Sequence, residues 1–406
     1  MKLAKRLASI EPFYVMEFAK AAAELARMPG CDPLQGGSPM IFLNIGEPDF
    51  TAPTLVREAA AAAIDNGRSQ YTDATGLPAL RVRISNWYQQ RFGLTIDADR
   101  VVVTAGASAA LQLLCLTLIE AGDEVLLPDP SYPCNRHFVA AADGTPVLLP
   151  AGPAERFQLS ADAVAQAWGP STRGVLLASP SNPTGTSIDP TEMGRIVDVV
   201  RRRGGFTLVD EIYLGLSFDD RYGQSALVHG QGHGDDVISI NSFSKYFNMT
   251  GWRLGWMVLP RALVPSVEKL AQNLFICPST LAQHAALACF EPESIAEYER
   301  RRTQFRKRRD LLVPGLEALG LPVPVMPDGA FYAWADCSRF ADPAAGGSWE
   351  FAFELMHKAH LAVTPGRDFG RHDTARFVRF SYANSLDQLN EALRRLAVVL
   401  PGMKRE

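Results

Sequence analysis

The chain of 406 residues is 47% hydrophobic and 21% charged, with a formal net charge of −4. This composition is typical of a globular enzyme with one large and one smaller domain, and the acidic balance argues against nucleic acid or a membrane surface as a partner. The six cysteines show no CxxC pair and the seven histidines no HExxH spacing. We therefore expect free thiols and no metal centre.

The N-terminal residues 1–25 read MKLAKRLASIEPFYVMEFAKAAAEL. They start basic, but Glu11 and Pro12 interrupt the apolar run that a signal peptide would need. We predict an amphipathic helix here that docks on another surface, such as a partner subunit. No later stretch approaches the roughly 20 apolar residues needed to span a bilayer, so we expect a cytoplasmic protein without a membrane partner.

Apolar runs alternate with helical patterns between about residues 100 and 260. The runs are RVVVTAG, DEVLLPDP, GVLLASPSNPTG, FTLVDEIY, DVISINSFSK and RLGWMVLP, and helical segments such as ASAALQLLCLTLIEAG and TEMGRIVDVVRRRG lie between several of them. Continuous apolar strands separated by amphipathic helices predict an α/β domain with a mainly parallel sheet covered on both faces. Its ligands are expected at the carboxyl ends of the strands.

The pattern changes after about residue 290. A long charged helix is predicted for ESIAEYERRRTQFRKRRDLLVPGLEAL, followed by short strands in FYAWAD and RFVRFSYA and a closing helix in SLDQLNEALRRLAVVL. We predict a large domain over residues 46–290. A smaller α+β domain combines residues 1–45 with residues 291–406.

Polar and aromatic residues follow several of the predicted strands. Gly106, Ala107 and Ser108 form a turn that opens a helix, which suits a phosphate but is also compatible with an ordinary strand–helix turn. Tyr132 lies in a proline-flanked loop, where it either stacks on a flat ligand or packs in the core. Asn182 lies in the turn of SPSNPTG.

The stretch SFSKYFNMTGWRLGW, residues 242–256, places Lys245 among aromatic residues and glycines. A charged lysine in apolar surroundings is energetically unfavourable unless a neighbouring group offsets its charge or its amine reacts with another group. The alternative interpretation is a solvated lysine in a surface loop. Asp210 ends the run FTLVDEIY, with Tyr213 three residues later. That carboxylate either caps a helix or pairs with a buried cation.

Together, and in this order, these motifs resemble those of the class I/II aminotransferases, which use pyridoxal 5′-phosphate. NIGEPDF, YTDATG, SPSNPTG, DEIY, SFSK with GWRLGW, GAFY, VTPGRDFG and RFSYA all follow the family's order over nearly the whole chain. The resemblance implies the fold-type I architecture, a three-layer large domain with a smaller α+β domain. It also implies a homodimer with shared active sites.

The resemblance assigns roles to individual residues. Lys245 matches the lysine whose amine bonds to the cofactor aldehyde and later acts as a base, and Asp210 matches the partner of the pyridinium nitrogen. Tyr213, with Asn182 beside it, matches the phenol that hydrogen-bonds the ring oxygen. Tyr132 matches the aromatic residue that stacks on the ring.

The cofactor phosphate is expected at the N-terminus of the helix that follows residue 106. Its expected donors are the amides of Gly106 and Ala107, the hydroxyls of Ser108, Ser242 and Ser244, and the guanidinium of Arg253. Tyr71 matches the tyrosine that reaches the phosphate of the neighbouring subunit.

The substrate carboxylate is expected at Arg379, with help from Gly46 and Asn182. The implied reaction is a ping-pong transfer of an amino group from an L-amino acid of aspartate, alanine or aromatic type to a 2-oxo acid, with 2-oxoglutarate expected. A PLP-dependent C–S β-lyase of the same fold is the alternative, because it shares the catalytic residues.

The side-chain specificity is harder to predict. Arg367 stands where the family usually has a small residue; an ion pair with Asp368 or Asp373 is favoured over contact with a distal substrate carboxylate. Phe13, Tyr14 and Phe331 are candidates to line an apolar or aromatic pocket.

Overall fold

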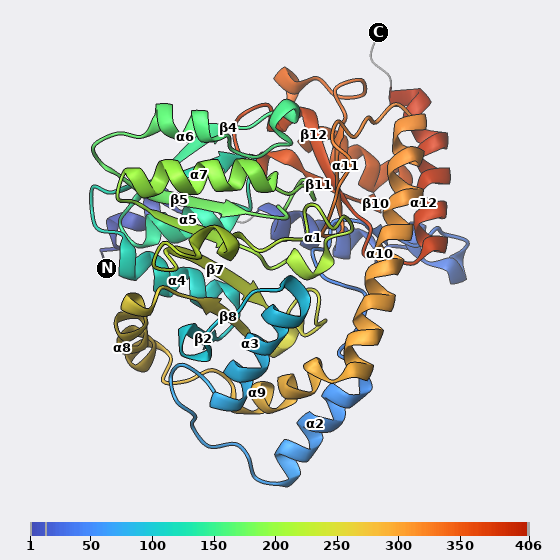
Figure 1. The fold of residues 1–406 in the computed structure, drawn as a ribbon. Helices are drawn as coiled ribbons and strands as arrows, with labels where there is room; N and C mark the ends of the chain where they lie inside the picture. The colour runs from blue at the N-terminus through green and yellow to red at the C-terminus, as the bar shows by residue number, and fades with distance from the viewer. Residues whose placement is uncertain (1, 13, 404–406) are drawn as a thin grey trace.

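The computed structural model describes residues 2–12 and 14–403, and its central feature is a twisted sheet (Figure 1). The strand order is β2-β8-β7-β6-β5-β3-β4. All neighbouring pairs are parallel except those of β8, which is antiparallel to β2 and β7. The strands are β2 (Val101–Thr104), β3 (Glu124–Asp129), β4 (Thr145–Pro150), β5 (Thr172–Ala178), β6 (Phe206–Asp210), β7 (Val237–Ser242) and β8 (Gly255–Val258).

Helices cover both faces of this sheet, which explains why its strands are continuously apolar. In β5, Val175 and Leu177 belong to one core, whereas Leu176 between them belongs to the other. The face with Leu176 is covered by α4 (Ala107–Leu118), α5 (Pro133–Ala141) and α8 (Val264–Leu274). The opposite face is covered by α3 (Pro78–Phe92), α6 (Ala161–Ala167) and α7 (Pro190–Arg202). The predicted α/β fold is confirmed.

The C-terminal part forms smaller sheets beside the large one. Strands β11 (Thr364–Pro365), β12 (Phe377–Ser381) and β9 (Tyr332–Asp336) form an antiparallel sheet, and β1 (Ile41–Phe42) pairs with β10 (Leu361–Ala362). The helices α11 (Ser348–Ala359) and α12 (Leu386–Val399) pack against them, and the long α10 (Pro292–Ala318) runs from α2 (Thr54–Asp65) and α9 (Thr280–Leu287) up to α12 (Figure 1). The domain boundary near residue 290 remains a prediction.

The N-terminal region differs from the single predicted helix. Lys5–Ser9 forms a 3-10 helix, and α1 (Tyr14–Leu25) begins after the Glu11–Pro12 interruption. The helix docks on its own chain: the Phe18 ring lies 5.1 Å from that of Phe353. The predicted docking surface is therefore supplied within the chain.

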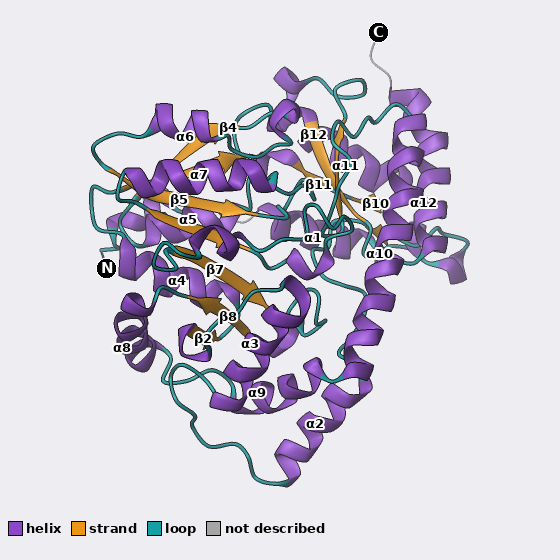
Figure 2. Cartoon of the chain, in the orientation of Figure 1, coloured by secondary structure: helices purple, strands orange, loops and turns teal. Residues whose placement is uncertain are grey.

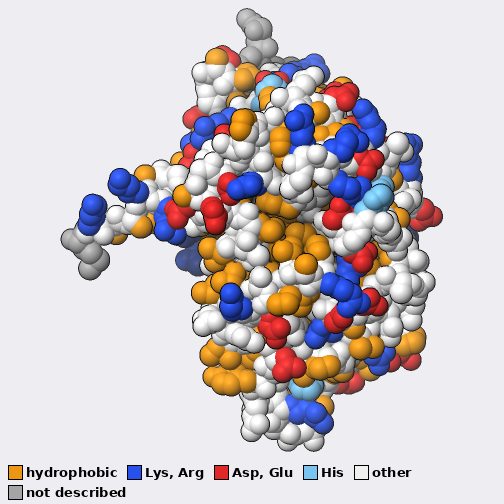
Figure 3. Space-filling view, turned by 60° about the vertical axis from the view of Figure 1, so that its left-hand side comes forward, with side chains coloured by type: hydrophobic (Ala, Val, Ile, Leu, Met, Phe, Trp, Pro, Cys, Tyr) orange, Lys and Arg blue, Asp and Glu red, His pale blue; other side chains and the backbone are white. Residues whose placement is uncertain are grey.

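The surface carries charges of both signs. Helices form most of the outside of the molecule and the strands lie within it (Figure 2). On the face shown in Figure 3, acidic and basic side chains are interspersed around a central area of hydrophobic ones. Among the described residues, every helix is too short or too polar to cross a bilayer.

Candidate active site

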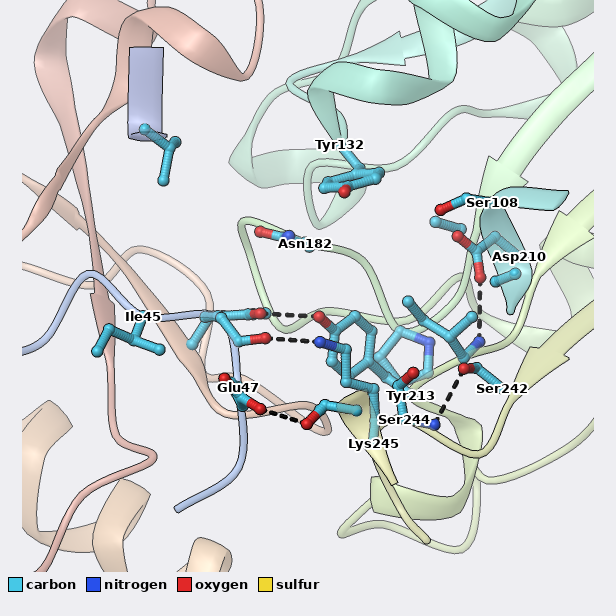
Figure 4. Close-up of a pocket in the computed structure, with 18 of the residues that line it drawn as sticks. Ile45, Glu47, Ser108, Tyr132, Asn182, Asp210, Tyr213, Ser242, Ser244 and Lys245 are labelled. Atoms are coloured by element: carbon cyan, nitrogen blue, oxygen red, sulfur yellow. Dashed lines mark hydrogen bonds between the residues drawn. The ribbon is translucent and has the colours of Figure 1, made fainter. Parts of the chain in front are cut away.

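A cavity of about 500 Å³ opens at the carboxyl ends of β5, β6 and β7. Segments far apart in the sequence meet there, as expected for a parallel sheet. All of the predicted site residues except Gly106 and Tyr71 line this cavity. They are Gly46, Ala107, Ser108, Tyr132, Asn182, Asp210, Tyr213, Ser242, Ser244, Lys245, Arg253 and Arg379. Figure 4 labels Lys245, Asp210 and most of the others.

Lys245 follows β7 and extends into the cavity. Its Nζ donates a hydrogen bond to the carbonyl oxygen of Gly46 at 2.6 Å. Burial lowers the pKa of the Lys245 amine to about 8. The negative charges of Glu47 and Asp210 oppose this shift, whereas the positive charges of Arg379 and Arg253 add to it. At pH 7 about a tenth of the amine is therefore unprotonated, far more than for an ordinary lysine, and this neutral form is the one that acts as a nucleophile or base.

Asp210 ends β6 and is 4% exposed. Its Oδ1 accepts a hydrogen bond from Ile212 N at 3.1 Å, and burial raises the pKa of the carboxyl to about 6, opposed by the charge of Lys245. Since Asp210 forms no ion pair within the described residues, this carboxylate can take a cation from a ligand in the cavity.

One end of the cavity is built for an anion. Gly106 is the N-cap residue of α4 and has φ 83°. Arg253 lies next to it, and a Cβ atom on Gly106 would lie 2.6 Å from Arg253 Nη2. Only glycine therefore allows the guanidinium to approach the helix N-terminus. An ordinary strand–helix turn has no need of such an arrangement, so the structure favours the anion-binding interpretation.

The serines of SFSK complete this end. The backbone N–H of Ser244 donates to Ser242 Oγ at 3.0 Å (Figure 4). Ser108 lies in the first turn of α4, where its hydroxyl faces the same space. Hydroxyls, free helix amides and a guanidinium form a suitable donor set for a phosphate dianion.

Tyr132 and Tyr213 lie on different sides of the cavity (Figure 4). The hydroxyl of Tyr213 lies 2.7 Å from that of Tyr332, and both residues are buried. Tyr332 ends the motif GAFY, and no role is assigned to it from the sequence pattern. Only its distance from Tyr213 in the folded chain identifies it.

Arg379 is 3% exposed and lies on β12. Nη1 donates to Asn182 Oδ1 at 2.7 Å, and Nη2 donates to the Asn44 carbonyl at 2.8 Å and to Thr364 Oγ1 at 3.2 Å. Nε has no partner among the described residues. Of the five N–H groups of a guanidinium, these bonds occupy three, which leaves two for a substrate carboxylate.

The rest of the cavity wall differs from the predicted aromatic lining. Val15 and Met16 from α1, together with Ile45 and Glu47, line this part of the cavity. Phe331 is fully buried, and neither it nor Tyr14 is a lining residue. Phe13 lies outside the described residues.

The contacts of Arg367 also differ from the expected ion pair. Its guanidinium carbon lies 4.3 Å from the ring centroid of Tyr14 and 4.6 Å from that of Trp349. Within the described part of the chain it forms no ion pair with Asp368 or Asp373. Asp368 instead accepts a hydrogen bond from the backbone N–H of Val15 at 2.5 Å, at the start of α1. Arg367 therefore supports the helix that carries Val15 and Met16.

Tyr71 lies outside the cavity and is 80% exposed. Its predicted role concerns a neighbouring subunit and stays a prediction. The residues that the structure describes bring together no group of three or more His, Cys, Asp or Glu side chains suited to a metal ion.

Comparison with known proteins places the chain in a family. The sequence profile described as "Aminotransferase class I and II" matches residues 38–396. The valine–pyruvate aminotransferase of Mycobacterium tuberculosis is 39% identical over 97% of this chain and 98% of its own length. The aspartate aminotransferase of Rhizobium meliloti is 33% identical, covering 97% and 95%. A crystal structure of an aminotransferase from M. tuberculosis superposes with a TM-score of 0.91 at 38% identity, covering 99% of this chain and 100% of the other.

The chain belongs to the class I and II aminotransferases, which depend on pyridoxal phosphate. The cavity fits this cofactor. Arg253, for which Gly106 leaves room, would suit the phosphate, the buried carboxylate of Asp210 would suit the ring nitrogen, and the Lys245 amine, whose pKa is lowered, would suit the aldehyde.

Proposed function

We propose that the site residues perform a ping-pong transamination between an L-amino acid and a 2-oxo acid. The observation that carries the proposal is the convergence of Lys245, Asp210 and Arg379 in one cavity. Pyridoxal phosphate, when bound, supplies an aldehyde for the amino group and a ring that withdraws electrons from Cα. The protein must hold this ring, orient the substrate and move one proton.

The cofactor is held at both ends. Arg253, the first amides of α4 and the hydroxyls of Ser242 and Ser244 would bind the phosphate, while Asp210 would keep the ring nitrogen protonated. Tyr132, which lines the same cavity, would pack on the ring face. Holding the ring from several sides fixes its plane relative to Lys245.

Arg379 and Asn182 bind the substrate α-carboxylate through the N–H groups that the protein leaves unused. With this carboxylate fixed, the Cα–H bond stands beside Lys245. With cofactor and substrate bound, the unprotonated Nζ of Lys245 would be the base that takes the proton from Cα and then gives it back. A pKa of about 8 suits an amine that must both accept and release a proton.

We further propose that the substrates have neutral, aliphatic side chains. Val15, Met16 and Ile45 form an apolar wall, and Glu47 contributes a carboxylate beside it. The cations that line the described cavity are Lys245, Arg253 and Arg379, and this proposal assigns them to the cofactor aldehyde, the cofactor phosphate and the substrate α-carboxylate. Among the described residues that line the cavity, a second substrate carboxylate would find no further cation and would face Glu47.

The same reasoning applies to the acceptor. In a ping-pong reaction both substrates occupy one site in turn, so a wall that disfavours a second carboxylate does so for donor and acceptor alike. Of the donor types expected from the sequence, alanine-like ones fit, whereas aspartate and 2-oxoglutarate fit poorly. The similarity to a valine–pyruvate aminotransferase supports this choice, although aspartate aminotransferases are also among the relatives.

A homodimer is part of the proposal. Tyr71 and Ile64 are exposed large side chains, at 80% and 61%. A second copy would cover such side chains and bring its Tyr71 to the phosphate end of this cavity. Light scattering should then report twice the chain mass of 44.3 kDa.

A half-reaction assay tests the function. The yellow holoenzyme is mixed with valine, leucine, alanine, aspartate or glutamate without an acceptor, and the loss of cofactor absorbance is followed. We expect rapid conversion with the aliphatic donors and slow conversion with the dicarboxylic ones. The variant Met16→Lys adds a cation to the wall and should increase the rate of conversion by aspartate. Leu34→Lys, at a position 96% exposed, is the matched control.

Two outcomes would contradict the proposal at different levels. Conversion by aspartate that is as fast as by valine rejects the neutral substrate class but leaves transamination intact. Pyruvate and ammonia released from cystathionine without any 2-oxo acid would instead favour the β-lyase reaction.

A further inference from the structure

Tyr332 contacts both Tyr213 and Arg379 in the cavity. Its hydroxyl lies 2.7 Å from that of Tyr213, and its ring lies beneath the guanidinium of Arg379, 4.4 Å from Cζ to the ring centroid. We propose that Tyr332 is a positioning residue that holds and polarises the Tyr213 phenol for the cofactor ring oxygen. This inference rests on the proposed function, since it assigns Tyr213 to that oxygen.

The sheet fixes this arrangement. Tyr332 on β9 is paired with Ser381 on β12, and Arg379 lies two residues from Ser381 on the same strand. Residues two apart on a strand share a face, so Tyr332 and Arg379 project to the same side. The arrangement therefore follows from the register of two buried strands.

The hydroxyl of Tyr332 is also closely surrounded by other parts of the chain. A Cβ atom on Gly46 would lie 2.9 Å from the Tyr332 oxygen. The two tyrosine rings meet edge to face, with centroids 5.6 Å apart at 79°. Tyr213 is the hydrogen-bond partner of the Tyr332 hydroxyl within the described residues. A buried hydroxyl with such a partner is held in one orientation.

The direction of the hydrogen bonds follows from the chemistry of a phenol, which has one proton to donate. If Tyr213 gives its proton to the cofactor ring oxygen, it can only accept from Tyr332. Hydrogen bonds in such a chain strengthen one another by about 10–30%. Tyr332 thus makes Tyr213 a stronger donor. A stronger donor to the ring oxygen disfavours protonation of the neighbouring nitrogen that joins Lys245 to the cofactor.

Spectroscopic titration of the holoenzyme tests this inference without measuring turnover. The cofactor absorbance is recorded against pH for the wild type, Tyr332→Phe, Tyr213→Phe and the double variant. We expect Tyr332→Phe to raise the pH midpoint of this absorbance titration by a few tenths of a pH unit, and Tyr213→Phe to raise the midpoint further. In the Tyr213→Phe background, Tyr332→Phe should have no additional effect.

The control is Tyr88→Phe, a fully buried tyrosine outside the cavity whose hydroxyl accepts from Trp256 Nε1 at 3.2 Å. It should leave the midpoint unchanged. An unshifted Tyr332→Phe midpoint, or an equal shift in both backgrounds, would overturn the inference. If Tyr332→Phe yields no folded protein, Tyr332→Leu, which is smaller and also lacks a hydrogen-bond donor, replaces it in the same comparison and is judged by the same outcomes. Failure of the wild type to bind the cofactor at Lys245 would reject the proposed function itself.

Discussion

Replacing Arg379 by lysine tests the proposed carboxylate site. The guanidinium already donates to Asn182, Asn44 and Thr364, and two of its N–H groups remain for the substrate. A lysine keeps the charge but has no planar fork, so at best one of these two contacts survives. Each hydrogen bond to a charged group contributes about 1.5–3 kcal/mol. Losing one should reduce kcat/KM by roughly 10- to 160-fold, since about 1.36 kcal/mol corresponds to tenfold.

The assay is the half-reaction with valine, compared with isobutylamine, which lacks the carboxylate. The wild type and Arg379→Lys should convert the amine equally slowly and differ only with valine. Arg376→Lys is the matched control, because Arg376 is half-exposed and pairs with Asp336 at 2.6 Å on the surface side; we expect less than about a twofold change. A valine kcat/KM for Arg379→Lys within about threefold of the wild type, or an equal loss with the amine, would refute the reasoning.

Three further predictions concern charge. Without cofactor, acylation of Lys245, followed by peptide mass spectrometry, should reach half its maximum near pH 8; a midpoint near the ordinary value of about 10.4 would contradict this. Burial raises the pKa of Glu211 from 4.5 to about 7, so the native state holds a proton there that the unfolded chain has released. Stability is therefore lost as pH rises through this window, and Glu211→Gln should flatten the dependence of Tm on pH between 4.5 and 7; an unchanged slope would refute it. Arg367→Ala removes two cation–π contacts of about 0.5–1 kcal/mol each. It should lower Tm and raise KM for valine and aspartate alike in steady-state assays. A loss of kcat/KM with aspartate alone would show instead that Arg367 binds the distal carboxylate.

Much of the fold could be predicted because strand signals are local. The apolar runs that became β5, β6 and β7 are continuous, and their ends carry the polar residues that line the cavity. The reversed direction of β8 was not predicted, because an apolar run gives no information on its orientation in a sheet. Strand β4 was missed because it lies at the sheet edge, where its residues are only partly buried.

The cofactor end of the site was predictable for a similar reason. Asp210 and Lys245 follow buried strands in recognisable motifs, so sequence order and sheet topology suffice to bring them together. The substrate end depends on contacts between distant segments. Val15 reaches the cavity because its helix is held by Asp368, 353 positions later in the chain, and no local pattern encodes that distance.

The central claim is that Lys245 forms the covalent bond to the cofactor. Borohydride reduction of the yellow holoenzyme, followed by proteolysis and mass spectrometry, measures this directly. The reduced pyridoxyl group should appear on the peptide that contains Lys245, and Lys245→Ala should carry none. Label on a different lysine in the wild type, or equal label in Lys245→Ala, would contradict the account.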